Sequence, residues 1–398
     1  MSSDSGMMLC LGSGKTPRYK ANTLQLLAMP AGCHVQFRYS ADIVEADTRK
    51  KLDEYAVRSP RFYTHDSDTP EDEPWREFRE DWRERLHDEF EEQRSSPQRA
   101  LLAHVDISDG GRQGDGCCRV VPCRFANLVE ARKIDDFYIL VFRLSDFAIA
   151  SDERLFQQSL PNSIPHWASS EAIEGYWCQV LRRPPVALDD IRDTNGWVRC
   201  VDQLRTSTDF SKQPYFYNIE GIFGSDRRRK CRPNREGSFE LAAANDYELS
   251  LFHYDPDADF HTGNKDPRAL TVNSSSNITL RSSSRLAIDS PYDLKVVRFS
   301  TGAATKREFA FLSLKRTEPE SDSSDLYPEL YFPVVVRGSV AMSVVNGLIL
   351  GALLSAQAGL AILARASPSK WLIEGIVAVV LGLCTGLFVS FGMKKPLS

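Results

Sequence analysis

The chain has 398 residues, of which 42% are hydrophobic and 26% are charged, and its formal net charge is −5. A length of this order is typical of two or three domains. The composition excludes a largely disordered polypeptide, because enough apolar residues are present to bury cores. The acidic balance argues against a protein that mainly coats DNA or RNA, so no nucleic-acid partner is expected.

The N-terminus carries no signature of export or lipidation. It lacks the basic start and the apolar run of about 7–15 residues that a secretory signal needs, and Ser2 stands where N-myristoylation requires glycine. The 9 cysteines are scattered, which fits a reducing compartment better than a disulfide framework. We therefore expect the N-terminal region to lie in the cytosol.

A Gly-Ser-Gly-Lys-Thr run at residues 12–16 looks like the end of a phosphate-binding P-loop. A P-loop also needs glycine five positions before Gly14, and that position is Leu9. It should follow a strand and precede a helix, which the eight preceding residues and Pro17 do not indicate. We interpret the match as chance.

Residues 1–151 predict a β-rich domain with one helical insertion. Strand signals occur at residues 34–40, 101–107, 119–125 and 137–144. Residues 74–93 predict an amphipathic helix, because Trp, Phe and Leu recur there at steps of three and four behind Pro74. Acidic residues prevail on its other face, so we expect this helix to pack on the sheet rather than to lie on a membrane.

Residues 152–235 predict a β and irregular connecting region that ends in a basic loop at 227–235. A strand is expected near residues 215–223. The loop holds the only dense basic cluster of the sequence, which consists of Arg227, Arg228, Arg229, Lys230 and Arg232. Such a cluster can bind the phosphate of a nucleotide or lipid headgroup, and the alternative is a solvated loop between strands.

Residues 236–336 predict a β-sandwich of the immunoglobulin-like kind. Short strands recur with Gly, Pro, Asn, Asp and Ser between them, at 239–243, 247–254, 269–272, 278–288, 294–299, 309–314 and 330–336. Pro333 should place the last strand at a sheet edge, because proline lacks the N–H that a central strand needs.

A cluster of acidic and histidine residues lies within this part of the chain. Asp255, Asp257 and Asp259 alternate and are followed by His261. Alternating carboxylates can present oxygens to calcium, although the EF-hand pattern fails because Phe260 stands where it requires glycine. The alternative is an Asp-Pro-Asp turn between two strands. No cofactor is expected beyond the divalent cation that this cluster would allow. Strand alternation places His253 on a core face.

The C-terminal part predicts a transmembrane hairpin at residues 339–393. Residues 340–364 carry no charge, and residues 372–393 carry only Glu374. At about 1.5 Å per residue each run is long enough to cross a hydrocarbon core of about 30 Å. Two spans return the chain to its starting side, so the N-terminal region and the tail at 394–398 should both be cytosolic, with the turn outside. We expect an integral membrane protein, in the plasma (inner) membrane.

Small residues recur at intervals of four along both expected spans. They are Gly347, Gly351, Ser355 and Gly359 in the first span and Ala378, Gly382, Gly386 and Ser390 in the second. Such faces let helix backbones approach closely. The partner is either the other span or a second copy of the chain.

Two hypotheses follow for function. The favoured one is a membrane-anchored cytosolic interaction or sensor protein that binds a ligand or protein. It would oligomerise through the hairpin and act on the membrane. This hypothesis involves no catalysis, and the sequence leaves open whether the chain is an enzyme. The alternative is a membrane-attached hydrolase or nucleotide-processing enzyme that uses the Asp/His cluster at 253–261 or the basic loop.

Overall fold

The computed structural model describes most of the chain before residue 339. The described residues are 6–13, 17–40, 44, 48–52, 98–108, 117–134, 136–164, 176–211, 213, 215–225, 229–255, 268–288, 290–304, 307–317 and 329–338. This part is mainly β, as the sequence predicts. The expected helix at 74–93 and both expected spans lie outside it. Within the described ranges no helix is long and apolar enough to cross a membrane.

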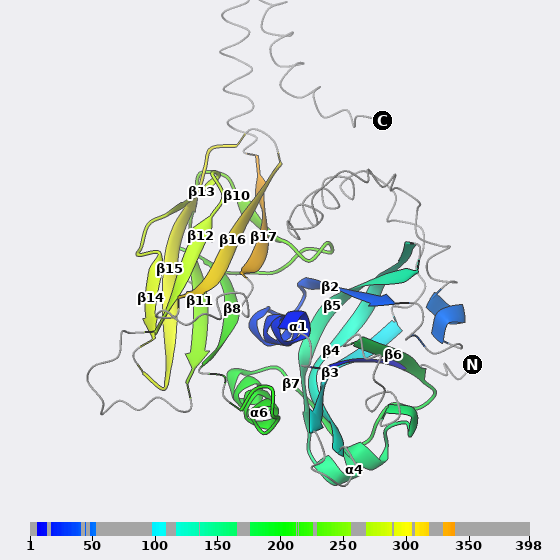
Figure 1. Ribbon diagram of the computed structural model, residues 1–398. Coiled ribbons are helices and arrows are strands. Elements are labelled where there is room, and N and C mark those ends of the chain that lie inside the picture. The colour runs from blue at the N-terminus through cyan, green and yellow to red at the C-terminus, as the bar shows by residue number, and fades with distance from the viewer. Residues whose placement is uncertain are drawn as a thin grey trace, which may run out of the picture.

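The N-terminal half is built on one mixed 7-stranded sheet, called sheet A (Figure 1). Its main path runs β2-β5-β4-β3-β1-β6, and β7 pairs with β5. The strands are β1 (Met7–Ser13), β2 (His34–Ser40), β3 (Gln98–Ser108), β4 (Cys117–Ile134), β5 (Phe137–Ala150), β6 (Tyr176–Leu181) and β7 (Leu188–Ile191). Strands β1 and β3 are parallel, and the other pairs of this sheet are antiparallel. Beyond β2, Val44 forms a bridge to Cys178 on β6, so the two ends of the sheet approach each other.

Helices α1 (Pro17–Ala28), α4 (Glu153–Gln158) and α6 (Thr194–Arg205) accompany sheet A. Proline suits the first position of α1, because its missing N–H needs no partner there. Asp152 and Asp193 cap α4 and α6, since each carboxylate accepts a main-chain N–H of the first turn. Helix α6 buries a face that includes Trp197, Cys200 and Leu204.

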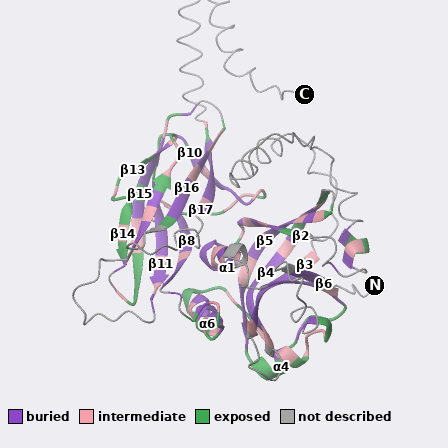
Figure 2. Ribbon diagram, in the orientation of Figure 1, coloured by how far each residue is buried: buried purple, intermediate pink, exposed green. Residues whose placement is uncertain are grey.

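The second half consists of two 5-stranded sheets that face each other across apolar side chains (Figures 1 and 2). Sheet B has the order β13-β15-β11-β8-β9, and sheet C has the order β10-β17-β16-β12-β14. The strands of sheet B are β8 (Phe216–Gly224), β9 (Lys230–Cys231), β11 (Asp246–Tyr254), β13 (Ile278–Leu280) and β15 (Tyr292–Thr301). Those of sheet C are β10 (Phe239–Ala242), β12 (Arg268–Ser274), β14 (Arg285–Ile288), β16 (Glu308–Thr317) and β17 (Leu330–Arg337).

The expected strands all coincide with strands of the structure, with one range divided. Residues 278–288 form β13 and β14 on different sheets, because the chain turns between them. The connecting region 152–235 supplies elements to both halves, since β6 pairs with β1 and β8 pairs with β11.

The expectation that Pro333 marks an edge strand is wrong. Strand β17 lies inside sheet C, between β10 and β16. Its pairing with β10 begins only at Val334, opposite Phe239. Proline therefore stands just outside this ladder, where its missing N–H leaves no partner unsatisfied.

The expectation for the flanks of residues 12–16 is also wrong. Strand β1 ends at Ser13, the second residue of this run, and α1 begins at Pro17 directly after it, so a strand and a helix do flank the run. The apolar residues Met7, Met8, Leu9 and Leu11 were too few to distinguish a buried strand from a short patch, and all four are buried in β1. Leu9 still fails the P-loop pattern.

Helix α1 lies between sheet A and the second half of the molecule (Figure 1). The carbonyl oxygen of Leu27, near its end, accepts two hydrogen bonds, from Trp197 Nε1 at 3.0 Å and from Asn218 Nδ2 at 2.7 Å. The Trp197 ring also meets Phe252 of β11 edge-on, with the ring centres 5.5 Å apart. Helices α1 and α6 thus join sheet A to sheet B through buried contacts.

Candidate functional site

Polar side chains gather where β3 ends beside β1. The parallel register places Gly12 opposite His104 and Ser13 opposite Val105, so the carboxyl ends of both strands meet at one edge of sheet A. Ligands of α/β proteins bind at this kind of edge, where strands run out into loops. The connector after α6 crosses this edge. We call His104, Asp106, Thr208, Asp209 and Phe210 the His104 cluster.

The imidazole of His104 is fully buried and lies against a carboxylate. His104 Nε2 is 3.0 Å from Asp209 Oδ2, and the Asp209 side chain is 25% exposed. The rings of His104 and Phe210 pack edge to face, with their centres 5.0 Å apart. Lys20 of α1 places its ammonium 5.5 Å from the centre of the Phe210 ring. One side of the cluster is therefore covered by Phe210 and α1, and the Asp209 carboxylate is partly exposed to solvent.

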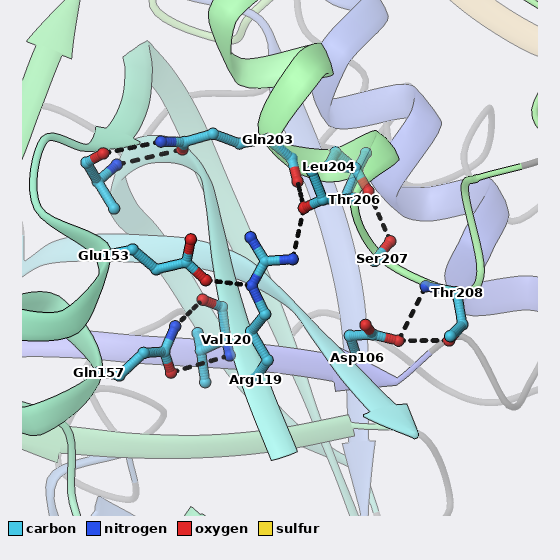
Figure 3. A network of polar contacts seen from close by, with 11 residues as sticks. Asp106, Arg119, Val120, Glu153, Gln157, Gln203, Leu204, Thr206, Ser207 and Thr208 are labelled. Carbon is cyan, nitrogen blue, oxygen red and sulfur yellow. Dashed lines mark hydrogen bonds and ion pairs between the residues drawn. The ribbon is translucent and has the colours of Figure 1, made fainter. Parts of the chain in front are cut away.

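Asp106 binds the same connector at Thr208, the residue before Asp209. Its Oδ1 accepts the main-chain N–H of Thr208 at 3.1 Å and also the Thr208 hydroxyl (Figure 3). Because Asp106 is only 7% exposed, these hydrogen bonds replace the water that its carboxylate would otherwise need.

A second polar group extends the cluster toward α4 (Figure 3). Arg119 of β4 is paired with Asp106 of β3. Its guanidinium donates to Glu153 of α4 and to the Thr206 hydroxyl. Two glutamines fasten the helices to strand backbones. Gln157 exchanges two hydrogen bonds with Val120, and Gln203 exchanges two with Ala150. The connector is thus held at residues 206, 208 and 209 by three strand side chains.

The sequence analysis missed the His104 cluster. A signal was present, because His104 and Asp106 interrupt an apolar strand at alternate positions, where their side chains share a face. The acidic partner was beyond reach, since Asp209 is over a hundred positions away in the chain. Chemically, an imidazole beside a carboxylate can accept or donate a proton, or fix the connector in place.

The basic loop is described only in part. Arg227 and Arg228 lie outside the described residues, whereas Arg229, Lys230 and Arg232 are exposed around β9. The ammonium of Lys230 lies 5.6 Å from the centre of the Phe223 ring on β8. Phe223 and Lys230 are paired across β8 and β9, so Lys230 belongs to the ladder between these two strands.

The Asp/His cluster is described only at its start. Asp257, Asp259 and His261 lie outside the described residues. Asp255 is 3% exposed, and its N–H donates to the carbonyl oxygen of Pro291. His253 is fully buried, as strand alternation predicts, and its Nε2 lies 2.9 Å from the carbonyl oxygen of Ser290.

The described residues contain no group of three or more His, Cys, Asp or Glu side chains that could hold a metal ion. The small residues of the expected spans all lie outside the described residues, so their packing stays a prediction.

Comparison with known proteins adds little. No family model matches the chain, and no curated protein matches it. Among solved structures, a GH5 xyloglucanase from Bacteroides ovatus has a TM-score of 0.16 and 10% identity over 25% of this chain and 17% of its own. A family 123 glycoside hydrolase from Clostridium perfringens has a TM-score of 0.21 and 12% identity over 32% of this chain and 27% of its own. Likenesses this low carry no argument about function.

Proposed function

We propose that the chain is a membrane-anchored cytosolic interaction or sensor protein. Its head, residues 1–338, contains the β-rich N-terminal domain and an immunoglobulin-like sandwich. The hairpin at 339–393 holds the head at the plasma (inner) membrane, and its small-residue faces bring copies of the chain together. The bilayer and a second copy are thus the expected partners, and the head binds the ligand or protein that triggers assembly.

One observation carries this proposal: β17 is an interior strand of sheet C and leads directly toward the expected first span. It pairs with β10 and β16 on its two sides and ends at Arg337. The Arg337 guanidinium forms an ion pair with Glu240 of β10. Because the expected span begins at residue 340, few residues separate the sandwich from the hairpin. Movement or clustering of the head would therefore be transmitted to the spans.

Contacts within the head support the same route. The hydrogen bonds of Trp197 and Asn218 to Leu27 tie sheet A to sheet B. Binding at the N-terminal half would thus reach the sandwich through α1 and α6.

The test is membrane depolarisation in cells that overexpress the full chain, followed with a voltage-sensitive dye. An oligomerising effector should depolarise the membrane, and a double Gly351→Leu, Gly382→Leu variant at equal abundance should do so much less. If the full chain leaves the potential unchanged, the hairpin serves as an anchor only, and action on the membrane is withdrawn.

A second candidate function is the membrane-attached hydrolase or nucleotide-processing enzyme. The contact between His104 and Asp209 favours it, because a carboxylate close to an imidazole is a recurring arrangement of general bases. The 253–261 cluster supports it less among its described members, since His253 lies against a main-chain oxygen rather than a carboxylate.

The two buried histidines provide a matched test of the enzyme. Hydrolysis of p-nitrophenyl esters and of nucleoside triphosphates would be measured for the full chain in detergent, across pH 5–9. Activity that falls at least about tenfold in His104→Gln and persists in His253→Gln would support a role for His104. Absence of any turnover by the parent protein would remove this candidate.

A further inference from the structure

Two buried thiols face each other across the pairing of β1 and β6. Cys10 and Cys178 are directly opposite in this antiparallel register, and their Sγ atoms lie 3.7 Å apart. Cys10 is 2% exposed and Cys178 is fully buried. Opposed residues of an antiparallel pair have Cα atoms about 4.5–5.5 Å apart, which falls within the range of about 4.4–6.8 Å that a disulfide spans. Bond formation therefore needs movement of the side chains and little movement of the backbone.

The thiol pair lies where the two ends of sheet A approach each other. Cys178 pairs with Cys10 on one side and forms the bridge to Val44 on the other. Two residues further along β6, the N–H of Val180 donates to Thr48 Oγ1 at 2.9 Å. On the other strand, Cys10 precedes Gly12, which stands opposite His104. A covalent link at this point would fix β6 to the strand that leads into α1 and borders the His104 cluster.

We propose that Cys10 and Cys178 form an oxidation-dependent staple that locks β6 onto β1. The oxidant is a hydroperoxide such as hydrogen peroxide. One thiol, as its thiolate, attacks a peroxide oxygen, which gives a sulfenic acid and one water molecule. The second thiol attacks that sulfur, so the S–S bond forms and a second water molecule leaves. Two thiols thus lose two hydrogens and two electrons, and one hydrogen peroxide becomes two water molecules.

The reduced pair is stable in its closed position. The contact with Cys10, together with burial, raises the pKa of the Cys178 thiol well above its usual value, so the thiolate is rare at neutral pH. Because both thiols are buried, the peroxide reaches them only when β6 opens locally. The S–S bond then forms when the strands pair again, with little change in their closed backbone. Strand β6 ends the sheet path, and its other side is held by an isolated bridge to Val44 rather than by a full ladder, so it should open more readily than an interior strand. The staple would therefore form under sustained exposure to the oxidant.

The experiment treats the full chain in detergent with hydrogen peroxide, blocks free thiols with N-ethylmaleimide and maps the peptides by mass spectrometry. A peptide pair linked through Cys10 and Cys178 is expected. The linked residues are 168 positions apart, so the loop closed is long and the thermal midpoint should rise by about 5 °C or more. Dithiothreitol should reverse both changes.

Cys33 supplies the control. It is buried within the same core as the pair and its pKa is also raised by burial. Cys33→Ser should keep the linked peptide and the shift, whereas Cys10→Ser and Cys178→Ser should lose both. Absence of the linked peptide from the oxidised parent protein overturns the proposal, and this result does not depend on whether any variant folds. A shift that persists in Cys10→Ser also overturns it. Neither outcome bears on the membrane anchor.

Discussion

Replacement of Arg124 by methionine should destabilise the head, because this side chain joins β4, β5 and the end of α1. Arg124 is 1% exposed. Its Nη1 donates to the carbonyl oxygens of Leu26 at 2.9 Å and Met29 at 2.8 Å, and its Nε donates to the oxygen of Ser145 at 2.9 Å. The last carbonyls of a helix lack partners of their own, so the guanidinium caps α1.

The expected magnitude follows from two opposing effects. Three hydrogen bonds from a charged donor contribute roughly 5 kcal/mol, at about 1.5–2 kcal/mol each. Burial lowers the pKa of Arg124 from 12.5 to about 10, and this corresponds to a cost of roughly 3 kcal/mol for holding the charge. Methionine fills much of the volume but leaves buried carbonyl oxygens without this donor. We therefore expect the free energy of unfolding to fall by about 2–4 kcal/mol.

Arg99 provides a matched control for this substitution. Both guanidinium groups lie over a phenylalanine ring, Arg124 over Phe147 at 4.0 Å and Arg99 over Phe125 at 4.6 Å. Arg99 is exposed, so Arg99→Met should cost less than about 1 kcal/mol. Urea unfolding of the full chain in detergent, followed by tryptophan fluorescence, would compare them. Equal midpoints for the two variants would refute the capping role of Arg124.

Three further predictions concern packing, acid and assembly. Gly196→Ala should unfold α6 at lower temperature, because a Cβ atom there would lie 2.0 Å from Ile191 Cγ2. In the control Gly302→Ala the added Cβ atom would lie 3.4 Å from its nearest neighbour, so the thermal midpoint should fall much less. Equal midpoints for the two variants would contradict the clash. Burial acts to raise the pKa of Glu329, but hydrogen bonds from Ser313, Asn273 and Tyr331 lower it below its usual value. The carboxylate therefore stabilises the fold above about pH 4.5, and this stabilisation is lost as the pH falls through the lowered pKa. Urea midpoints measured at pH 6 and pH 3 should fall less in Glu329→Gln than in the parent, and parallel losses would contradict the assignment. Crosslinking in membranes should yield fewer oligomers for Gly351→Leu and Gly382→Leu than for the parent. If both variants crosslink like the parent, the small-residue faces of the two spans serve only the hairpin itself.

Strands were predictable where core residues, aromatic or aliphatic, recur at every second position. The ranges 247–254 and 309–314 needed only a period of two, since one face of β11 and of β16 fills the sandwich core. Helix α1 was missed because its sequence, PRYKANTLQLLA, has a weak apolar stripe, and its position depends on packing against β8 and β4. Tertiary contacts decide such segments.

The candidate site was less accessible to sequence reasoning than the fold. His104 lies at the edge where the parallel strands β1 and β3 end, and the connector after α6 brings Asp209 to it. Neither the parallel pairing nor a partner this distant leaves a local pattern. The acidic run at 255–259 attracted attention because its carboxylates are close in sequence, yet Asp255 is buried beside Pro291.

Alkaline carbonate extraction tests membrane anchorage most directly. Membranes from cells that express the full chain would be compared with those from cells that express a chain ending at Val336. We predict that the full chain stays in the membrane pellet and that the shortened chain is released. A cysteine in place of Ser367 should also react with an impermeant maleimide from outside intact cells, whereas one in place of the exposed Ser151 should not. Release of the full chain by carbonate, or labelling of Ser151→Cys in intact cells, would contradict the account.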